Sequence, residues 1–341
     1  MHAVNRQWLL TRRPHGQVLE TDFTYREAPL PEPDLAAGEL LVRNLMFSFD
    51  PAMRGWMDDR PSYLPPVDIG APMRAGAIAQ VVRSGNPNYP VGTLVQGLFG
   101  WQDYVVVNRA GELPPNTVPP GVAPEVALGV LGGASLTAYF GLLDVGALTT
   151  GDTVLVSGAA GAVGSVVAQI ARIKGCRTVG IAGGAEKCRW LVDECGLDAV
   201  IDYRSEAIGE RLAALCPQGI DVFFDNVGGE TLEAAIDHMA VHGRIVLCGA
   251  ISGYNDAEPA PGPRNLFRLI TQRVRMEGFV MIDFMDRIGE AATALAGWVM
   301  GGQIQHREDI QQGFENIPKT FLRLFTGANQ GKQLLKLAEP E

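Results

Sequence analysis

The chain has 341 residues, of which 47% are hydrophobic and 19% charged, and its formal net charge at pH 7 is −10. This length is sufficient for two domains with separate cores. An acidic chain is not attracted to nucleic acid or to anionic membranes, so neither is expected as a partner. Five scattered cysteines without a C-x-x-C pair, and no apolar run of signal-peptide or membrane-spanning length, predict a cytoplasmic protein with reduced thiols.

Short strands separated by Gly- and Pro-rich turns dominate the first 130 residues. Runs of this kind predict a small β domain of barrel type. Residues 29–33 and 114–124 are rich in proline and are expected to be extended connections. The predicted strands lie at residues 7–10, 39–46, 75–84, 92–97 and Tyr104–Val107.

A different pattern begins with the apolar run Thr153–Ser157, which is typical of a buried parallel strand. Ala159, Gly161 and Gly164 follow with the spacing A-x-G-x-x-G, and an amphipathic helix then runs to Gly175. Small residues at this spacing allow a tight turn, close approach to a pyrophosphate and packing of the helix on the sheet. The alternative is a tight turn packed without a ligand, but the strand before and the helix after favour dinucleotide binding.

Strands and helices alternate beyond this motif, which predicts right-handed crossovers and a doubly wound parallel sheet in an α/β fold. From residue 314 the chain carries one more helix and a strand at residues 333–337, and this tail is expected to return to the first domain. The predicted strands are Arg177–Ala182, 199–203, Ile220–Asp225, 244–248 and 276–282. The predicted helices are 186–195, 206–215 and 230–239, with further elements at 263–273 and 287–300.

Seven short motifs resemble the zinc-independent double-bond reductases of the medium-chain dehydrogenase/reductase superfamily, a branch that includes prostaglandin (leukotriene), curcumin and plant alkenal reductases. The resemblance implies a GroES-like β-barrel-type catalytic domain at 1–130, completed by 314–341, and a Rossmann NADP-binding domain at 131–313. It also implies a homodimer, for which we expect the predicted edge strand 276–282 to pair across a two-fold axis. The motifs are SFDPAMR (48–54), GWQDY (100–104), SLTAYFG (135–141), GAAGAVGS (158–165), DNVGGE (225–230), RIVLCGAISGYN (244–255) and GANQGK (327–332).

A metal site is not expected. No cysteine precedes Cys176, so the N-terminal domain has neither a cysteine ligand nor a four-cysteine lobe. His2 and His15 lie in the region of the first strand, away from any expected catalytic position.

The end of the second Rossmann strand favours NADP(H) over NAD(H). An NAD site usually carries an Asp or Glu there, whereas this strand ends in IAGGAEK without a carboxylate at its edge. Lys187 follows one helical turn later, where a cation can bind a 2′-phosphate. A solvated surface lysine is the alternative. The resemblance assigns Lys187 and Tyr203 to the 2′-phosphate.

The resemblance also implies the remaining cofactor contacts. Asn226 follows a predicted strand at the end where open α/β sheets bind ligands, although it also suits a turn. Asn329 is assigned to the cofactor, with a loop at a helix end as the alternative. Cys248 is expected to be a small buried residue rather than a nucleophile. The full predicted set, besides Lys187 and Tyr203, is Gly161, Ala162, Val163, Gly164, Ser165, Asn226, Cys248, Gly249, Ala250, Ile251, Phe279 and Asn329.

Tyr254 is the predicted catalytic residue. Its phenol can donate a hydrogen bond to a substrate carbonyl oxygen and stabilise negative charge there; a packed aromatic or a contact to the cofactor ribose are the alternatives. The implied reaction is NADPH-dependent reduction of the C=C bond of an α,β-unsaturated ketone or aldehyde. Hydride goes to the β-carbon, Tyr254 and a cofactor ribose hydroxyl hold the enolate, and solvent supplies the proton. An NADPH:quinone reductase and a low-turnover NADPH-binding sensor are the competing hypotheses.

The substrate region departs from the pattern of the family at one position. Relatives commonly have DPYMR, with a tyrosine lining the pocket, where this chain has Ala52 in DPAMR. Tyr63 is expected to fill part of the gap, or else to be a loop aromatic. Met53 and Met281 are further pocket candidates, with a place in the core as the alternative for each.

Overall fold

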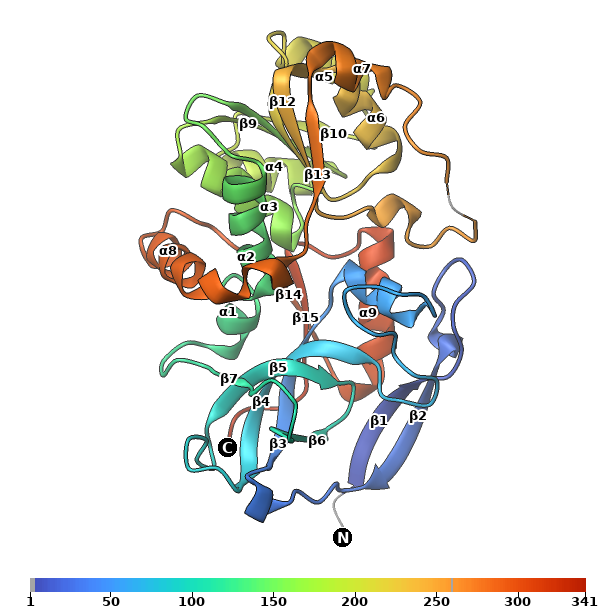
Figure 1. Ribbon diagram of the computed structural model, residues 1–341, viewed down its shortest axis with the longest axis vertical. Coiled ribbons are helices and arrows are strands. Elements are labelled where there is room, and N and C mark those ends of the chain that lie inside the picture. Colours follow the sequence, from blue (N-terminus) through green and yellow to red (C-terminus); the bar gives the residue numbers. More distant parts are fainter. Residues whose placement is uncertain (1–3, 259) are drawn as a thin grey trace. The chain divides into compact units, whose positions relative to one another are not determined.

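The computed structural model describes residues 4–258 and 260–341, which form two compact units (Figure 1). Unit 1 contains residues 4–129, Glu308–Ala328 and Lys332–Glu341, and unit 2 contains Val130–Arg307 and Asn329–Gly331. The tail therefore returns to unit 1 from Glu308 onward and leaves it again for three residues, Asn329–Gly331. The domain boundaries expected from the sequence did not include this short excursion.

Unit 1 is built on a seven-stranded sheet and a two-stranded hairpin. The two long central strands, β3 (Leu40–Ser48) and β4 (Arg74–Ser84), pair antiparallel and are mostly buried, as their nearly continuous apolar sequences require. The sheet order is β14 (Glu308–Gln312), β15 (Lys332–Lys336), β3, β4, β5 (Leu94–Gly100) and β7 (Asn116–Thr117), with β6 (Tyr104–Val107) also paired to β3. The hairpin consists of β1 (Val4–Leu10) and β2 (Phe23–Pro29).

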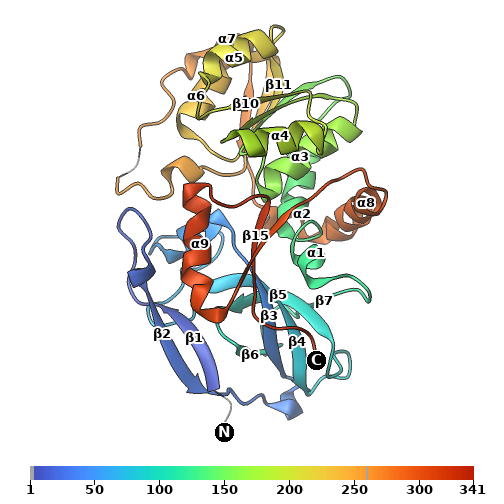
Figure 2. The ribbon, with the colours of Figure 1, turned by 180° about the vertical axis from the view of Figure 1, so that it is seen from behind.

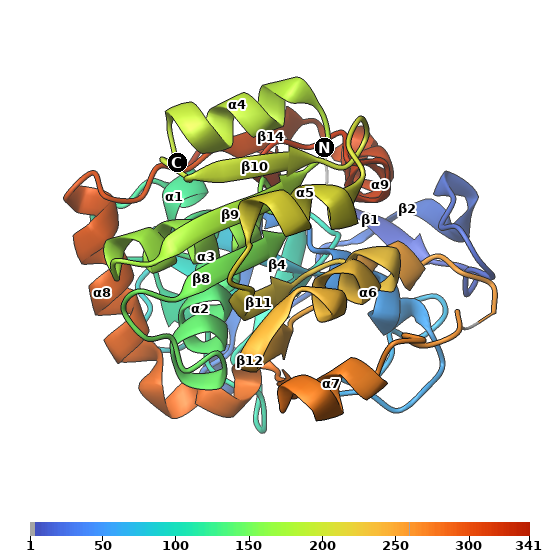
Figure 3. The same cartoon turned by 90° about the horizontal axis from the view of Figure 1, so that it is seen from above.

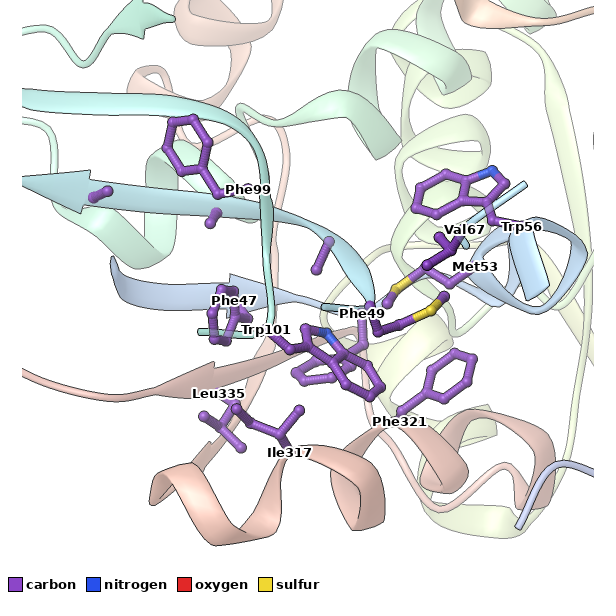
Figure 4. Packing of buried hydrophobic residues seen from close by; sticks show 14 of the residues in the cluster. Phe47, Phe49, Met53, Trp56, Val67, Phe99, Trp101, Ile317, Phe321 and Leu335 are labelled. Carbon is purple, nitrogen blue, oxygen red and sulfur yellow. The ribbon is translucent and has the colours of Figure 1, made fainter. Parts of the chain in front are cut away.

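An aromatic cluster holds the C-terminal helix of unit 1 against these strands. Helix α9 (Ile317–Thr326) runs beside β15, and its Phe321 is fully buried (Figure 2). The Phe321 ring lies edge-on to Trp101, with 5.8 Å between ring centroids, and both rings also contact Phe49. Figure 4 shows these rings with Met53 beside them. The tail thus completes the core of unit 1.

Unit 2 contains a six-stranded sheet whose neighbouring strands are all parallel. The third, second and first strands in sequence lie on one side and the fourth, fifth and sixth on the other, so the order reverses between β8 and β11. In such sheets ligands bind beyond the carboxyl ends of the strands at this point. The predicted α/β fold, with a sheet-rich N-terminal domain and a parallel-sheet Rossmann domain, is confirmed. The order is β10 (Ala199–Asp202), β9 (Arg177–Ala182), β8 (Thr153–Ser157), β11 (Ile220–Asp225), β12 (Met239–Leu247) and β13 (Arg275–Gly278).

Helices cover both faces of the parallel sheet (Figure 3). On one face Leu155, Phe223 and Ile245 pack against α5 (Ile208–Leu215) and α6 (Gly229–Asp237). On the other face α3 (Ala162–Ile173) packs against β8, β9 and α2 (Gly133–Phe140). The remaining helices of unit 2 are α4 (Ala185–Asp193), α7 (Phe267–Gln272) and α8 (Ile288–Met300), while α1 (Pro124–Leu128) belongs to unit 1.

Some element boundaries differ from the sequence prediction. The expected strand 276–282 ends at Gly278, because Met281–Arg287 forms a 3₁₀ helix, η6, and most of β13 is exposed rather than apolar and buried. The element expected at 263–273 is helix α7, which begins only at Phe267. Strands β2 and β14 were missed, since both carry mainly charged and polar side chains at exposed positions.

The expectation that no apolar run has membrane-spanning length is wrong for one segment. Helical residues from Pro124 to Val145 are long and apolar enough to cross a membrane by length and composition, and 61% of the tested window is buried inside the fold. Burial of this kind is what a core helix of a folded domain shows.

Candidate functional site

The glycine-rich turn after β8 leads directly into α3. Gly158 has a φ of +59°, and Gly161 is the residue that precedes the first turn of the helix. A side chain at Gly164 would place its Cβ only 2.4 Å from the carbonyl oxygen of Gly158, so the helix can pack this closely on the turn only with glycine there. The backbone N–H groups at the start of α3 are the donors that a pyrophosphate needs. Ala162, Val163 and Ser165 lie in this first turn, so the loop fits a dinucleotide.

The Asn329–Gly331 excursion lies against this turn. The Gly331 N–H donates to the carbonyl oxygen of Ala160 at 3.1 Å, and Gly331 forms a parallel bridge with Gly161. Gly331 has a φ of +68°, and a Cβ there would lie 2.1 Å from the Arg307 carbonyl oxygen. The Asn329 side chain donates to the Gly331 carbonyl at 3.0 Å. The predicted residue Asn329 is thus brought beside the glycine-rich turn by backbone pairing.

A buried carboxylate ties together the ends of β8 and β11. Asp225 is fully buried and accepts hydrogen bonds from the Ser157 hydroxyl at 2.6 Å and from the N–H groups of Val227 and Gly228 at 3.0 and 3.1 Å. Burial raises the pKa of Asp225, and these hydrogen bonds partly oppose that shift. The predicted residue Asn226 donates from its side chain to the Ser157 carbonyl at 2.8 Å.

Sequence reasoning missed Asp225 and Ser157 as parts of the site. Each is the last residue of an apolar strand, and a polar residue at that position is the sequence signal that identifies them. The hydrogen bond between Ser157 and Asp225 joins the carboxyl ends of β8 and β11. We call these two joined strand ends the floor of the site.

The loop after β12 packs onto the same floor. The N–H groups of Cys248 and Gly249 both donate to the carbonyl oxygen of Asp225, at 2.9 and 3.1 Å, and the Ile251 N–H donates to the Asn226 carbonyl at 3.3 Å. A Cβ on Gly249 would lie 3.2 Å from that Asn226 oxygen, tighter than most such contacts. The loop therefore sits close to the carboxyl ends of β11 and β12.

Tyr254 folds back over this loop. Its hydroxyl oxygen accepts a hydrogen bond from the Ala250 N–H at 3.1 Å and lies 3.3 Å from where a Cβ on Gly249 would be. The side chain is half-buried. A phenol oxygen that accepts one hydrogen bond still carries its own hydrogen as a donor. The predicted catalytic residue is therefore held at the ends of the strands beside the predicted cofactor residues of unit 2.

Cys248 is not a nucleophile in this setting. Burial, and secondarily the nearby charge of Asp225, raise the pKa of its thiol to about 12. A thiol that stays protonated at neutral pH is inert. The prediction that Cys248 is not a nucleophile agrees with this, while its solvent exposure makes it half-buried rather than buried.

The end of β9 carries the expected 2′-phosphate residues. Gly183 lies against the Tyr203 ring, because a Cβ on Gly183 would be 2.7 Å from that ring. Tyr203 is 52% exposed. Lys187 is half-buried in the first turn of α4, which starts at Ala185. The structure thus places Tyr203 and the start of the Lys187 helix around one corner, where no acidic side chain terminates β9.

Phe279 and Met281 follow β13 at the end of the sheet. Phe279 packs edge-on against Phe224 of β11, with 6.3 Å between ring centroids, and a Cβ on Gly141 would collide with its ring at 2.4 Å. Phe279 is half-buried, as is Met281 at the start of η6. Phe279 therefore has a packing role, and its cofactor contact stays a prediction.

The substrate candidates of unit 1 lie on or near the 3₁₀ helix η3 (Pro51–Met57). Met53 is fully buried in the aromatic core, which favours the alternative of a packing residue, while Ala52 is half-buried. Tyr63 is 47% exposed and its hydroxyl accepts a hydrogen bond from the Trp56 ring N–H at 3.0 Å. Tyr63 is thus fixed to the helix that carries Ala52.

Comparisons with known proteins place this architecture in a family. Two domain models match, one described as the N-terminal domain of oxidoreductase over residues 6–113 and one as zinc-binding dehydrogenase over residues 162–296. The chain is 41% identical over 344 residues to the NADPH-dependent curcumin reductase of Escherichia coli (strain K12), with 98% of this chain and 97% of the relative covered. It belongs to the medium-chain dehydrogenase/reductase superfamily.

Further relatives define the branch of this medium-chain reductase. Prostaglandin reductase 1 of Oryctolagus cuniculus is 40% identical over 333 residues, covering 96% of this chain and 92% of the relative. The crystal structure of CurA from Vibrio vulnificus in complex with NADPH matches with a TM-score of 0.91 and 40% identity, covering 98% of this chain and all of that one. The predicted zinc-independent double-bond reductase branch, and with it the prediction of an oxidoreductase, are confirmed.

One of the two matching domain models is named for zinc. Within residues 4–258 and 260–341, no group of three or more His, Cys, Asp and Glu side chains could hold a metal ion.

Proposed function

We propose that this NADPH-dependent oxidoreductase reduces the C=C bond of α,β-unsaturated ketones and aldehydes. The observation that carries the proposal is the position of Tyr254, whose hydroxyl is fixed by the Ala250 N–H at the carboxyl ends of β11 and β12. When bound, NADPH supplies the hydride that saturates the β-carbon. The chain supplies position and a hydrogen-bond donor.

Tyr254 would donate its hydroxyl hydrogen to the substrate carbonyl oxygen, where negative charge accumulates as the double bond is reduced. A donor fixed in advance stabilises that charge without having to reorganise during the reaction. The N–H group that holds the phenol oxygen comes from the loop anchored on Asp225, so the floor of the site sets the direction of the donor. No general acid is needed at the α-carbon, because solvent can protonate an enolate.

The chain would hold the cofactor by three parts of unit 2. The turn at Gly158–Gly161 would bind the pyrophosphate, Lys187 and Tyr203 the 2′-phosphate, and Asn226 and the loop from Cys248 to Ile251 the nicotinamide half. The names of the relatives, a curcumin reductase and a prostaglandin reductase, support a carbonyl-bearing substrate.

Replacing Tyr254 by phenylalanine tests the proposal. We expect kcat for a medium-chain enone to fall by about 100-fold, the usual effect of losing one donor to a developing oxyanion, while the Kd for NADPH changes less than about twofold. Tyr25→Phe, which removes an exposed phenol of β2 in unit 1, is the matched control and should leave both values unchanged. An unchanged kcat in Tyr254→Phe would remove Tyr254 from the mechanism.

The substrate panel should include the enone, its saturated ketone and a quinone. Turnover of the enone to the saturated ketone supports the proposal. Turnover of the quinone alone would favour a quinone reductase, and tight NADPH binding without any turnover would favour a sensor.

We also propose that two copies associate through β13, the last strand of the six-stranded sheet. Antiparallel pairing centred on Met276 would place Arg275 of each copy opposite Glu277 of the other, which pairs opposite charges. Light scattering after size-exclusion chromatography tests this: a dimer supports the proposal, and a monomer at micromolar concentration contradicts it.

A further inference from the structure

Arg204 lies just beyond the carboxyl end of β10. β10 runs parallel to β9 with Asp202 beside Ala182, and the two residues that follow β10 lie near the two glycines that follow β9. A Cβ on Gly184 would lie 3.6 Å from Nη1 of the Arg204 guanidinium. Arg204 therefore lies against the second of the two glycines that lead into α4, just as Tyr203 lies against the first.

The charge of Arg204 acts on Asp202 and contributes to lowering the pKa of that carboxyl, but the two side chains do not form an ion pair in the part of the chain that the structure describes. Arg204 is exposed, and within residues 4–258 and 260–341 its side chain is in no ion pair. The next arginine along the chain, Arg211, is instead bound to Glu206 at 2.8 Å. An arginine has a planar fork of donors that matches phosphate oxygens.

Asp202 fixes the backbone around Arg204. Its carboxylate accepts hydrogen bonds from the N–H groups of Gly184 at 2.9 Å and Arg204 at 3.1 Å. The Gly184 hydrogen bond is the main cause of a lowered pKa for Asp202, so this carboxylate is ionised at neutral pH. Glu206 adds a second negative charge, although it is paired with Arg211. Together they make the corner more acidic than the absence of a carboxylate on β9 suggested.

A 2′-phosphate carries a charge of about −1.5 to −2 near pH 7. One lysine offsets only part of that charge, and Asp202 opposes binding. A second cation at this corner would offset the negative charge that Lys187 alone leaves uncompensated.

We propose that Arg204 binds the 2′-phosphate of NADP(H) together with Lys187 and Tyr203. Lys187 would approach from the first turn of α4, and Arg204 from the end of β10. Arg204 is thereby a specificity-determining residue for NADP(H) over NAD(H). This inference rests on NADP(H) being the cofactor.

Binding of adenosine 2′,5′-bisphosphate and of 5′-AMP to the intact protein, measured by calorimetry, tests the inference without turnover. In Arg204→Gln we expect the Kd of the bisphosphate to rise about tenfold, the effect of losing one charge-assisted hydrogen bond, with the Kd of 5′-AMP unchanged. Arg204→Lys should recover part of the loss, because it keeps the charge but not the fork. Arg26→Gln, which removes an exposed cation from β2 of unit 1, is the matched control.

The outcomes separate the inference from its premise. A bisphosphate Kd in Arg204→Gln no higher than in Arg26→Gln overturns the role of Arg204, and a loss in Lys187→Gln alone would leave Lys187 as the phosphate ligand. If the unaltered protein binds the bisphosphate no better than 5′-AMP, the preference for NADP(H) itself fails. Equal losses for both nucleotides in Arg204→Gln would mean a structural role, and a thermal melt of each variant would identify that case.

Discussion

Unit 2 and unit 1 each contain a candidate functional region, and the two regions are built differently. We call the first the nucleotide corner: the glycine-rich turns of unit 2 with the loop at residues 248–251. The second is the η3 region of unit 1. The nucleotide corner is made of backbone: the turns at Gly158, Gly184 and Gly331 have positive φ angles. The η3 region is made of side chains from distant segments, such as Arg54, which donates to the carbonyl oxygens of Pro14 and Gly16.

This difference decides how each region responds to substitution. Few backbone conformations close such a turn, so adding a single Cβ atom lowers the stability of the fold strongly. Packed side chains can readjust, so the same kind of change is tolerated better. We therefore expect the largest losses in unit 2.

Asp225 should give the largest effect on stability. Asp225→Ala leaves the Ser157 hydroxyl and the N–H groups of Val227 and Gly228 without an acceptor in a buried place. We expect the free energy of unfolding, measured with urea, to fall by about 3 kcal/mol. Asp225→Asn keeps an amide oxygen as acceptor and is the control. A loss under about 1 kcal/mol in Asp225→Ala would show that the floor is not buried in solution.

The same pair of proteins tests the pKa of Asp225. Because burial raises its folded-state pKa, the native state holds the proton more tightly than the unfolded chain does. Asp225 thus contributes stability that is complete below the ordinary carboxyl pKa of about 4 and is lost as the pH rises through the raised pKa. The free energy of unfolding of the unaltered protein relative to Asp225→Asn should fall as the pH rises from about 4 through the raised pKa, and a flat difference would contradict the raised pKa.

Gly164→Ala should have the next largest effect. Its Cβ would lie 2.4 Å from the Gly158 carbonyl oxygen, which is backbone and cannot rotate away. We expect a loss of about 2 kcal/mol of stability and a rise of at least tenfold, on the order of 1.4 kcal/mol, in the Kd for NADPH. Gly297→Ala is the control, since a Cβ there meets nothing within 4 Å. Equal NADPH affinity in both variants would show that this turn does not bind the cofactor.

The two regions also differ in how far sequence predicted them. Strands β8, β9 and β11 were predicted with their observed ends, because apolar runs and glycines are local signals. The hydrogen bond between Ser157 and Asp225 joins residues 68 positions apart, and no local pattern specifies that pairing.

The sequence could not decide between a pocket and a core position for Met53. Its burial depends on Trp101 and on Phe321, which is more than 260 positions away and arrives with the returning tail. Similarly, the charge on Arg204 was visible in the sequence, but its contact with Gly184 follows from the register of β9 and β10.

Tyr63→Phe tests whether the packed side chains of the η3 region tolerate substitution better than the turns of unit 2 do. The change removes the acceptor of the Trp56 ring N–H while keeping the aromatic ring. We expect a loss of about 1 kcal/mol of stability, the net value of one hydrogen bond. If the loop lines the substrate site, KM for an enone should rise while the Kd for NADPH stays the same. Tyr89→Phe, which removes the hydrogen bond to the Pro115 carbonyl elsewhere in unit 1, controls for the loss of any phenol.

Ala52→Tyr completes this test, because it adds back the ring that relatives commonly carry. A change in the ranking of enones by size, without a change in NADPH affinity, would assign Ala52 to substrate selection. An identical ranking would place Ala52 outside the substrate site.

Cys248 should give the smallest effect, although it lies inside the nucleotide corner. With a pKa of about 12, its thiol is ionised in roughly one molecule in ten thousand at pH 8, so alkylation by iodoacetamide should be negligible over an hour. Cys188 is the internal comparison, because burial raises its pKa as well but it lies near the surface at the start of α4. Mass spectrometry should find Cys188 alkylated before Cys248.

Since the backbone N–H of Cys248, and not its sulfur, bonds to Asp225, Cys248→Ala should keep kcat and NADPH affinity within about twofold. A larger loss of kcat or of NADPH affinity would mean that the nucleotide corner depends on the Cys248 side chain. At that position the corner would then not be built from backbone alone, as the comparison with the η3 region assumes.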